Sequence, residues 1–143
     1  MPDVEQKQPT CKQRWRAEKD GRIADLRKLW EAYEKDPDTE VEDLGTLNEY
    51  GLSFDYVAPG TFSDQDEGFW RYQLSCGGPQ DEFRFYSSGA HDKPYRIEYW
   101  FLDWFDGHGR ALVGEDLVLL TDLWRWFEEM GSTEAEYEKA RED

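Results

Sequence analysis

Three consecutive segments between residues 69 and 105 alternate large rings with polar side chains, and this alternation constrains the fold most. Successive side chains of a β-strand point to opposite faces, so a period of two predicts a half-buried strand. The segments are 69–76, 82–87 and 95–105, and Gly-Gly-Pro and Ser-Gly turns separate them. Such short connections favour antiparallel neighbours. We therefore expect an antiparallel meander in which the third segment is central or covered on both faces.

Helical patterns flank these segments at both ends of the chain. Apolar residues recur there at spacings of three and four, which places them on one face of a helix. An earlier alternating stretch, 52–57, supplies a fourth strand candidate. The sequence thus predicts an α+β fold of two layers, a three- to four-stranded antiparallel meander flanked by an N-terminal and a C-terminal helix. The helical stripes are Ile23, Leu26, Trp30 and Tyr33, and Leu117, Leu120, Trp124 and Phe127.

The length favours a single domain over residues 1–143, with 1–11 and 132–143 frayed or peripheral. Gly21 is expected to interrupt the first helix, because glycine is a poor helix former. The stretch 106–109, Asp-Gly-His-Gly, is expected to form a turn or loop.

The composition contains one signal that favours disorder and one that favours a folded core. The chain is 38% apolar and 35% charged, with a formal net charge of −16, which leans towards disorder. Its seven Trp, eight Tyr and eight Phe argue the other way. Each buried ring removes roughly 150–250 Å² from water, and at about 25 cal/mol per Å² a dozen rings contribute tens of kcal/mol before entropy is subtracted. We expect a folded core built largely from rings.

Several functional classes are disfavoured. No apolar run is long enough to span a membrane, and the N-terminus lacks a secretory signal, so we expect a cytoplasmic protein. The negative charge disfavours binding to anionic lipid or directly to nucleic acid. Cys11 and Cys76 are expected to be reduced thiols, with a disulfide between them left open. No spacing of histidines and acids matches a metal site, so no metal or cofactor is expected.

The acidic residues are concentrated in one stretch. Between Pro37 and Trp70 there are nine acidic residues and no Lys or Arg. Self-repulsion of like charges opposes folding, so a basic protein partner is the simplest reason to keep them, with a merely solvated face as the alternative. The expected partner contacts are Asp38, Glu40, Glu42, Asp43, Asp64, Asp66 and Glu67.

The N-terminal helix differs in charge from the rest of the chain. Residues 11–30 hold seven bases and three acids, a balance of +4. One interpretation is a basic face for nucleic acid, and the other is a complement to the acidic body within one chain or across a homodimer. The surrounding negative charge favours the second interpretation.

A second function class depends on rings beside carboxylates. Asp103 and Asp106 flank Trp104 and a phenylalanine, close to Trp100. Such pairs occur in carbohydrate sites. The alternative function is therefore an aromatic-lined domain that binds a small ligand or carbohydrate, or hydrolyses one. No catalytic motif names a reaction, and we do not predict an enzyme.

Two stretches, Gly51 to Phe62 and Ile97 to Gly107, resemble small acidic proteins carried by phages and plasmids. In size, charge and aromatic content the whole chain is similar to anti-restriction and anti-CRISPR proteins, which often imitate DNA. The resemblance implies a DNA mimic that inhibits a nucleic-acid-binding enzyme or complex of host defence. These inhibitors share no common fold, so the resemblance assigns no functional residue.

Overall fold

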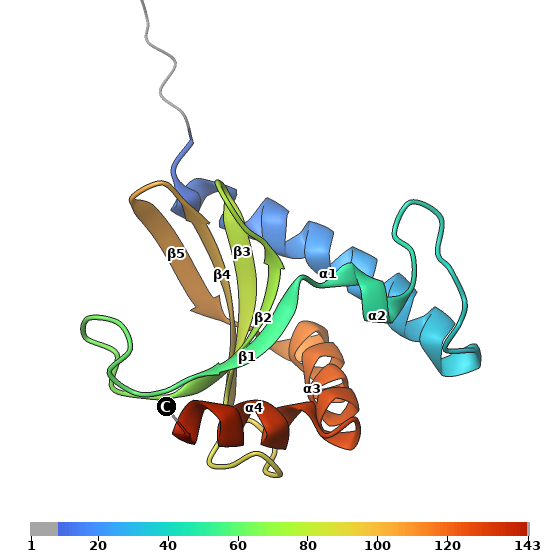
Figure 1. Ribbon diagram of the computed structural model, residues 1–143. Coiled ribbons are helices and arrows are strands. Elements are labelled where there is room, and N and C mark those ends of the chain that lie inside the picture. The colour runs from blue at the N-terminus through green and yellow to red at the C-terminus, as the bar shows by residue number, and fades with distance from the viewer. Residues whose placement is uncertain (1–8, 143) are drawn as a thin grey trace, which may run out of the picture.

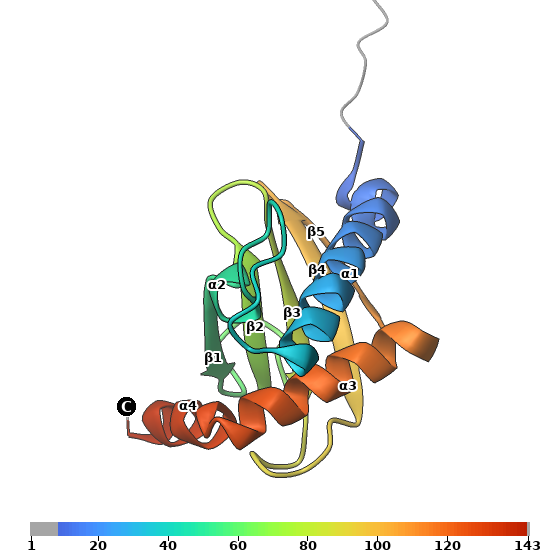
Figure 2. The same ribbon diagram turned by 90° about the vertical axis from the view of Figure 1, so that its right-hand side faces the viewer.

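The computed structural model describes residues 9–142, which form a twisted antiparallel sheet with helices against one of its faces (Figures 1 and 2). Five strands of the described chain follow one another in the order β1-β2-β3-β4-β5. The predicted α+β meander with a helix at each end is confirmed, although the sheet has five strands rather than three or four. The strands are β1 (Ser53–Val57), β2 (Phe69–Ser75), β3 (Gln80–Tyr86), β4 (Arg96–Asp103) and β5 (Asp106–Ala111).

The first long helix, α1 (Cys11–Lys35), begins at a capping box. Thr10 accepts the Gln13 amide at 3.2 Å, and the Gln13 side chain accepts the Thr10 amide at 2.9 Å. The helix ends at Asp36, just before a proline that cannot continue it. The interruption expected at Gly21 does not occur. One glycine costs a helix about 1 kcal/mol, and the residues buried on either side of it, such as Trp15 and Leu26, outweigh that cost.

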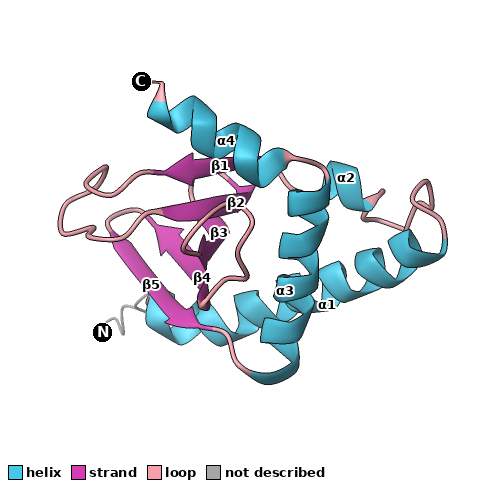
Figure 3. Cartoon of the chain, turned by 90° about the horizontal axis from the view of Figure 1, so that it is seen from below, coloured by secondary structure: helices cyan, strands magenta, loops and turns pink. Residues whose placement is uncertain are grey.

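The sheet's helix-covered face, called here the covered face, carries the core. Phe83, Phe85, Ile97 and Tyr99 are fully buried there. Helix α3 (Gly114–Glu129) and helix α1 lie across this face, as Figures 2 and 3 show. The apolar stripe predicted for the C-terminal helix is part of this packing, because Leu120, Trp124 and Phe127 are buried in the same cluster.

The strand missed by the sequence reading is β5, where a turn or loop was expected. Its sequence, DGHGRA, has little strand character. Trp100 on β4 explains Gly109, because its indole lies against this glycine on the neighbouring strand. A Cβ atom at Gly109 would lie 2.0 Å from Trp100 Cε2. The strand is therefore specified by its neighbour's ring rather than by its own propensity.

The C-terminal segment is packed rather than frayed. Helix α4 (Ser132–Arg141) lies against β1, and Thr133 is fully buried. Tyr137 packs edge-on against Tyr56 with ring centroids 4.9 Å apart, and the Trp70 indole donates to the Thr133 carbonyl at 2.9 Å. Residues 132–141 are thus ordered as a helix at the periphery of the fold rather than frayed, and Cys11 is buried at the start of α1. For residues 1–8 and 143 the expectation of frayed or peripheral ends lies outside the described residues.

Two further expectations concern the cysteines and membranes. Cys11 is buried and Cys76 is exposed, and both thiols are free. None of the helices formed by residues 9–142 combines the length and the apolar character needed to cross a membrane.

Candidate functional site

The structure divides the seven predicted contact residues into two groups. Four lie in the segment 36–46, here called the acidic loop, between α1 and the short helix α2 (Leu47–Tyr50). Three lie in the segment 58–68, here called the pocket loop, between β1 and β2. Figures 1 and 3 place these loops at opposite ends of the molecule. The predicted residues therefore form two separate surfaces.

The acidic loop has its own hydrogen bonds. Val41 and Gly45 exchange backbone bonds of 2.8 and 2.9 Å, and the Asp38 amide donates to the Asp36 carboxylate at 3.0 Å. Asp43 takes a left-handed φ of 68° inside this small ring of contacts, a conformation that Asp tolerates better than most residues. The local bonds order the backbone that carries the exposed carboxylates, which are Asp38, Glu40, Glu42 and Asp43.

The pocket loop is also held by its own contacts. The Gly60 amide donates to the Gln65 carbonyl at 2.8 Å, and the Gln65 side chain bonds to both the Phe62 amide and the Glu67 carbonyl, at 3.0 and 2.8 Å. Asp64 sits at the tip with a φ of 57°. This folded loop stands over the face of the sheet that no helix covers, here called the open face.

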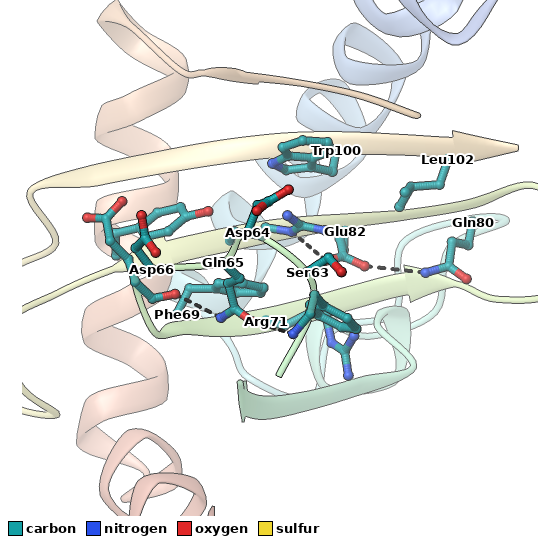
Figure 4. Close-up of a pocket in the computed structure, with 14 residues that line it drawn as sticks. Ser63, Asp64, Gln65, Asp66, Phe69, Arg71, Gln80, Glu82, Trp100 and Leu102 are labelled. Atoms are coloured by element: carbon teal, nitrogen blue, oxygen red, sulfur yellow. Dashed lines mark hydrogen bonds and ion pairs between the residues drawn. The ribbon is translucent and has the colours of Figure 1, made fainter. Parts of the chain in front are cut away.

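Between the pocket loop and the open face lies a pocket of about 470 Å³ (Figure 4). Cavities of roughly 300–1,000 Å³ are typical of ligand sites. The sheet side of the pocket comes from β2, β3 and β4, whose alternate residues share the open face. The loop side supplies Asp64, Asp66 and Glu67, so the pocket gathers three of the predicted contacts.

A stacked ion pair forms part of the pocket wall. Glu82 is only 1% exposed, and Arg84 donates its Nε–H to the Glu82 carboxylate at 2.7 Å. The Arg84 guanidinium also lies 4.2 Å from the Trp100 ring centroid and 4.7 Å from that of Phe69. A buried carboxylate is costly without such a partner. The rings and the pair together keep the charges in place away from water.

The other polar groups of the open face are engaged with one another. Arg71 bonds to both carboxylate oxygens of Asp55, at 3.0 and 2.7 Å. Glu98 accepts the Tyr86 hydroxyl at 3.0 Å and the Trp100 indole N–H at 2.9 Å. Trp100 therefore lines the pocket with its ring, because its indole N–H already donates to Glu98.

At the rim of the pocket, Glu67 differs from the two aspartates. Tyr95 and Arg96 each donate to the Glu67 carboxylate at 2.6 Å, and these hydrogen bonds hold the pKa of Glu67 below its usual value. Asp64 and Asp66 are exposed and form no hydrogen bond or ion pair with the side chains of residues 9–142. Only these two of the three rim carboxylates are available to a partner.

The basic N-terminal helix has partners within the chain. Arg14 pairs with Asp103 at 3.1 Å, and Lys19 pairs with Asp116 at 2.8 Å. Arg22 forms two bonds, of 2.7 and 3.0 Å, with Asp81 on β3. These pairs agree with the interpretation of α1 as an intramolecular complement to the acidic body.

The Arg22–Asp81 ion pair also contacts the covered face of the sheet. The Tyr99 hydroxyl donates to the same Asp81 carboxylate at 2.6 Å, and burial followed by this bond raises the pKa of Tyr99 well above its ordinary value. The cation of α1 and a core tyrosine therefore share one nearly buried acid.

The residues of the alternative function do not form one site, although Asp103 and Asp106 face each other across the β4–β5 hairpin. Trp100 lines the pocket on the open face. Asp103 binds Arg14, and Asp106 accepts the Cys11 amide at 2.8 Å, where its charge favours the N-terminus of α1. Trp104 is 89% exposed at the tip of the β4–β5 hairpin with a φ of 57°. The two carboxylates hold a helix in place, and the ring between them points to solvent.

Glu82, Arg84 and Phe69 are pocket residues that the sequence reading did not assign to a site. The alternation in 69–76 and 82–87 already places them on polar or mixed faces. What the alternation does not contain is the pairing register, which sets Arg71 opposite Arg84 and Glu82 opposite Trp100. No cluster of three or more His, Cys, Asp or Glu within 9–142 is arranged to hold a metal ion.

Comparisons with protein-family models, with curated proteins and with solved structures find no match for this chain. The case for function therefore depends on the geometry and charge of the two acidic surfaces.

Proposed function

We propose that the protein is a non-catalytic binding module that docks onto a cationic protein surface. In its specific form, it imitates nucleic acid and inhibits a nucleic-acid-binding enzyme or complex of host defence. The observation that carries the proposal is the contrast between its charges. Arg14, Lys19 and Arg22 of α1 are used in pairs within the chain, whereas the acidic loop carries exposed carboxylates with no Lys or Arg between residues 37 and 70.

Surplus charge of one sign acts at a distance. With a net charge of −16, the protein attracts a basic surface before contact, and its association is expected to be fast at low salt and slower at high salt. Duplex DNA presents one negative charge per roughly 1.7 Å of its axis. A basic groove built for that charge density also attracts the clustered carboxylates of the acidic loop. The ordered backbone of the loop limits the entropy lost on docking.

The separation of the two acidic surfaces sharpens the proposal. The acidic loop holds four of the seven predicted contacts, and none of them forms an ion pair with another described residue. At the pocket, Glu67 is already bound by Arg96. We therefore assign the main electrostatic contact to the acidic loop and a local, shape-dependent contact to the pocket.

The test is retention of basic proteins from a bacterial lysate on the immobilised protein, at low and at high salt, followed by elution with duplex DNA. The acidic-loop variant combines Asp38→Asn, Glu40→Gln, Glu42→Gln and Asp43→Asn. Asn at 43 tolerates the left-handed backbone, so the fold is expected to persist.

The matched control removes the same number of charges elsewhere, with Glu31→Gln, Glu129→Gln, Glu136→Gln and Glu142→Gln. We expect the immobilised protein to retain a basic lysate protein at low salt and to release it when duplex DNA is added. The control variant should retain the same lysate protein, and the acidic-loop variant should not. Equal retention by the two variants would contradict docking through the acidic loop. A retained protein that DNA does not displace would contradict nucleic-acid mimicry but not binding.

A further inference from the structure

We propose that the pocket between the pocket loop and the open face binds an arginine side chain of a peptide or protein partner. This inference deepens the proposed function and rests on it, because it names the group that the pocket takes from a basic partner. The pocket is a hollow of about 470 Å³ with rings in its wall and carboxylates at its mouth (Figure 4).

The hydrogen bonds of the wall decide the charge of the ligand. Arg71 is neutralised by Asp55, and Arg84 by Glu82. Asp64 and Asp66, by contrast, bind no side chain of residues 9–142. The free groups at the mouth are therefore acceptors that carry negative charge, and a ligand that donates hydrogen bonds and carries positive charge complements them.

The rings decide between the two basic side chains. Arg84 already lies over the Trp100 ring and Arg96 over the Tyr86 ring, at 4.2 and 4.0 Å from their centroids. The ring left for a ligand cation is that of Phe62 at the mouth, which is 48% exposed and has no cation over it among residues 9–142. A planar guanidinium stacks on a ring and bonds a carboxylate with two parallel N–H groups, whereas a compact ammonium approaches a ring as a point charge and lacks the two parallel donors. This wall chemistry favours arginine over lysine.

Arg84 offers a further contact to a peptide arginine through its unused N–H groups. Its guanidinium already lies over Trp100 and Phe69, at 4.2 and 4.7 Å from their centroids. Among the hydrogen bonds of the described residues it uses only Nε, as a donor to Glu82. Its terminal N–H groups can donate to a carbonyl oxygen, which a peptide arginine carries and a free guanidinium ion lacks.

The experiment uses N-acetyl-arginine amide as the probe and follows the indole N–H resonance of Trp100 in a ¹H–¹⁵N spectrum. Trp100→Phe identifies that resonance among the seven tryptophans. We expect a saturable shift of Trp100, and weaker binding of N-acetyl-lysine amide. Asp64→Asn with Asp66→Asn should weaken the arginine probe about tenfold, since two partly exposed ion pairs are lost. Glu31→Gln with Glu129→Gln removes the same charge from the helices and should change the affinity less than about twofold.

Three results would overturn the inference. The first is that the Trp100 resonance does not shift with the arginine probe, although the immobilised protein still retains a lysate protein that duplex DNA displaces. In that case the pocket inference fails and the proposed function stands. The second is equal weakening by both double variants, which would assign the effect to the overall charge. The third is a shift with inorganic phosphate but not with arginine, which would make the pocket an anion site.

Discussion

The two faces of the sheet solve the burial of aromatic rings in different ways. On the covered face, rings such as that of Phe85 pack against helix side chains such as Trp124 and exclude water. On the open face, Trp100 and Phe69 pack against the guanidinium of Arg84, whose charge is matched by Glu82. No helix is needed there, because the ion pair covers the rings and remains in contact with the pocket.

The faces also differ in how their polar atoms are satisfied. On the covered face, the Tyr72 hydroxyl is buried without a hydrogen-bond partner among the described residues. On the open face, the Tyr86 hydroxyl donates to Glu98 at 3.0 Å. Water can reach a partly open surface, so polar groups are tolerated there at low cost, whereas the dry face keeps a misfit because its packing is strong enough to hold it. The comparison indicates that stability comes mainly from the covered face, whereas the open face supplies the wall of the proposed arginine pocket.

The largest expected effect separates the faces by removing one indole from each. Trp124→Ala should cost about 4 kcal/mol of unfolding free energy, because the side chain is fully buried and leaves a cavity. Trp100→Ala should cost about half as much, roughly 2 kcal/mol, because Trp100 is only half-buried. Urea unfolding followed by circular dichroism measures both. Equal costs would show that the open face contributes to stability as much as the core does.

The ion pair of the open face gives the second effect. Glu82→Ala should destabilise the fold by about 2–3 kcal/mol, because it leaves Arg84 without its carboxylate among the rings. Arg84 is partly exposed, which keeps the cost below that of a fully buried charge. The measurement is a double-mutant cycle of unfolding free energies that compares Glu82→Ala, Arg84→Met and the double variant Glu82→Ala with Arg84→Met. A double variant as unstable as the sum of its single variants would show that the pair is not coupled.

The two faces differ in how much of their structure the sequence predicts. The alternation of 69–76, 82–87 and 95–105 specified the meander and the covered face, because period two needs only neighbouring residues. It missed β5, which depends on the contact between Trp100 and Gly109 across two strands. The acidic residues were located by composition, but their division into two surfaces follows from how the loops fold back. Glu82 and Arg84 lie two residues apart on one face of β3, as the alternation predicts, but only the register brings the rings of two other strands onto them.

The third effect compares the loss of a tyrosine hydroxyl from each face of the sheet. Tyr72→Phe removes an unpartnered buried hydroxyl and should stabilise the fold by about 1 kcal/mol. Tyr86→Phe removes a hydroxyl that is bonded to Glu98 and should destabilise it by about 1 kcal/mol. Thermal unfolding of the two variants under identical conditions gives the opposite signs directly. A loss of stability in Tyr72→Phe would mean that its hydroxyl is satisfied and that the contrast between the faces is smaller than the structure indicates.

The smallest effect concerns the edge of the open face, where Glu67 binds Tyr95 and Arg96. These bonds lower the pKa of Glu67 in the folded protein below its ordinary value of 4.5. A depressed pKa stabilises the fold at pH values above that ordinary value, and the contribution is lost as the pH falls through the folded pKa. Because the Glu67 side chain is 44% exposed, solvent screening limits the effect to a few tenths of a kcal/mol.

The measurement is the difference in unfolding free energy between the protein and its Glu67→Gln variant, followed from pH 6 down to the acid limit of the folded state. The difference should be largest at the upper end of this range and shrink towards zero as the carboxylate becomes protonated. A difference that does not change with pH would mean that folding leaves the pKa of Glu67 unshifted, so that its carboxylate gains nothing from Arg96. The rim would then have a third carboxylate free of Arg96, and the pocket would attract a cationic ligand more strongly than Asp64 and Asp66 alone allow.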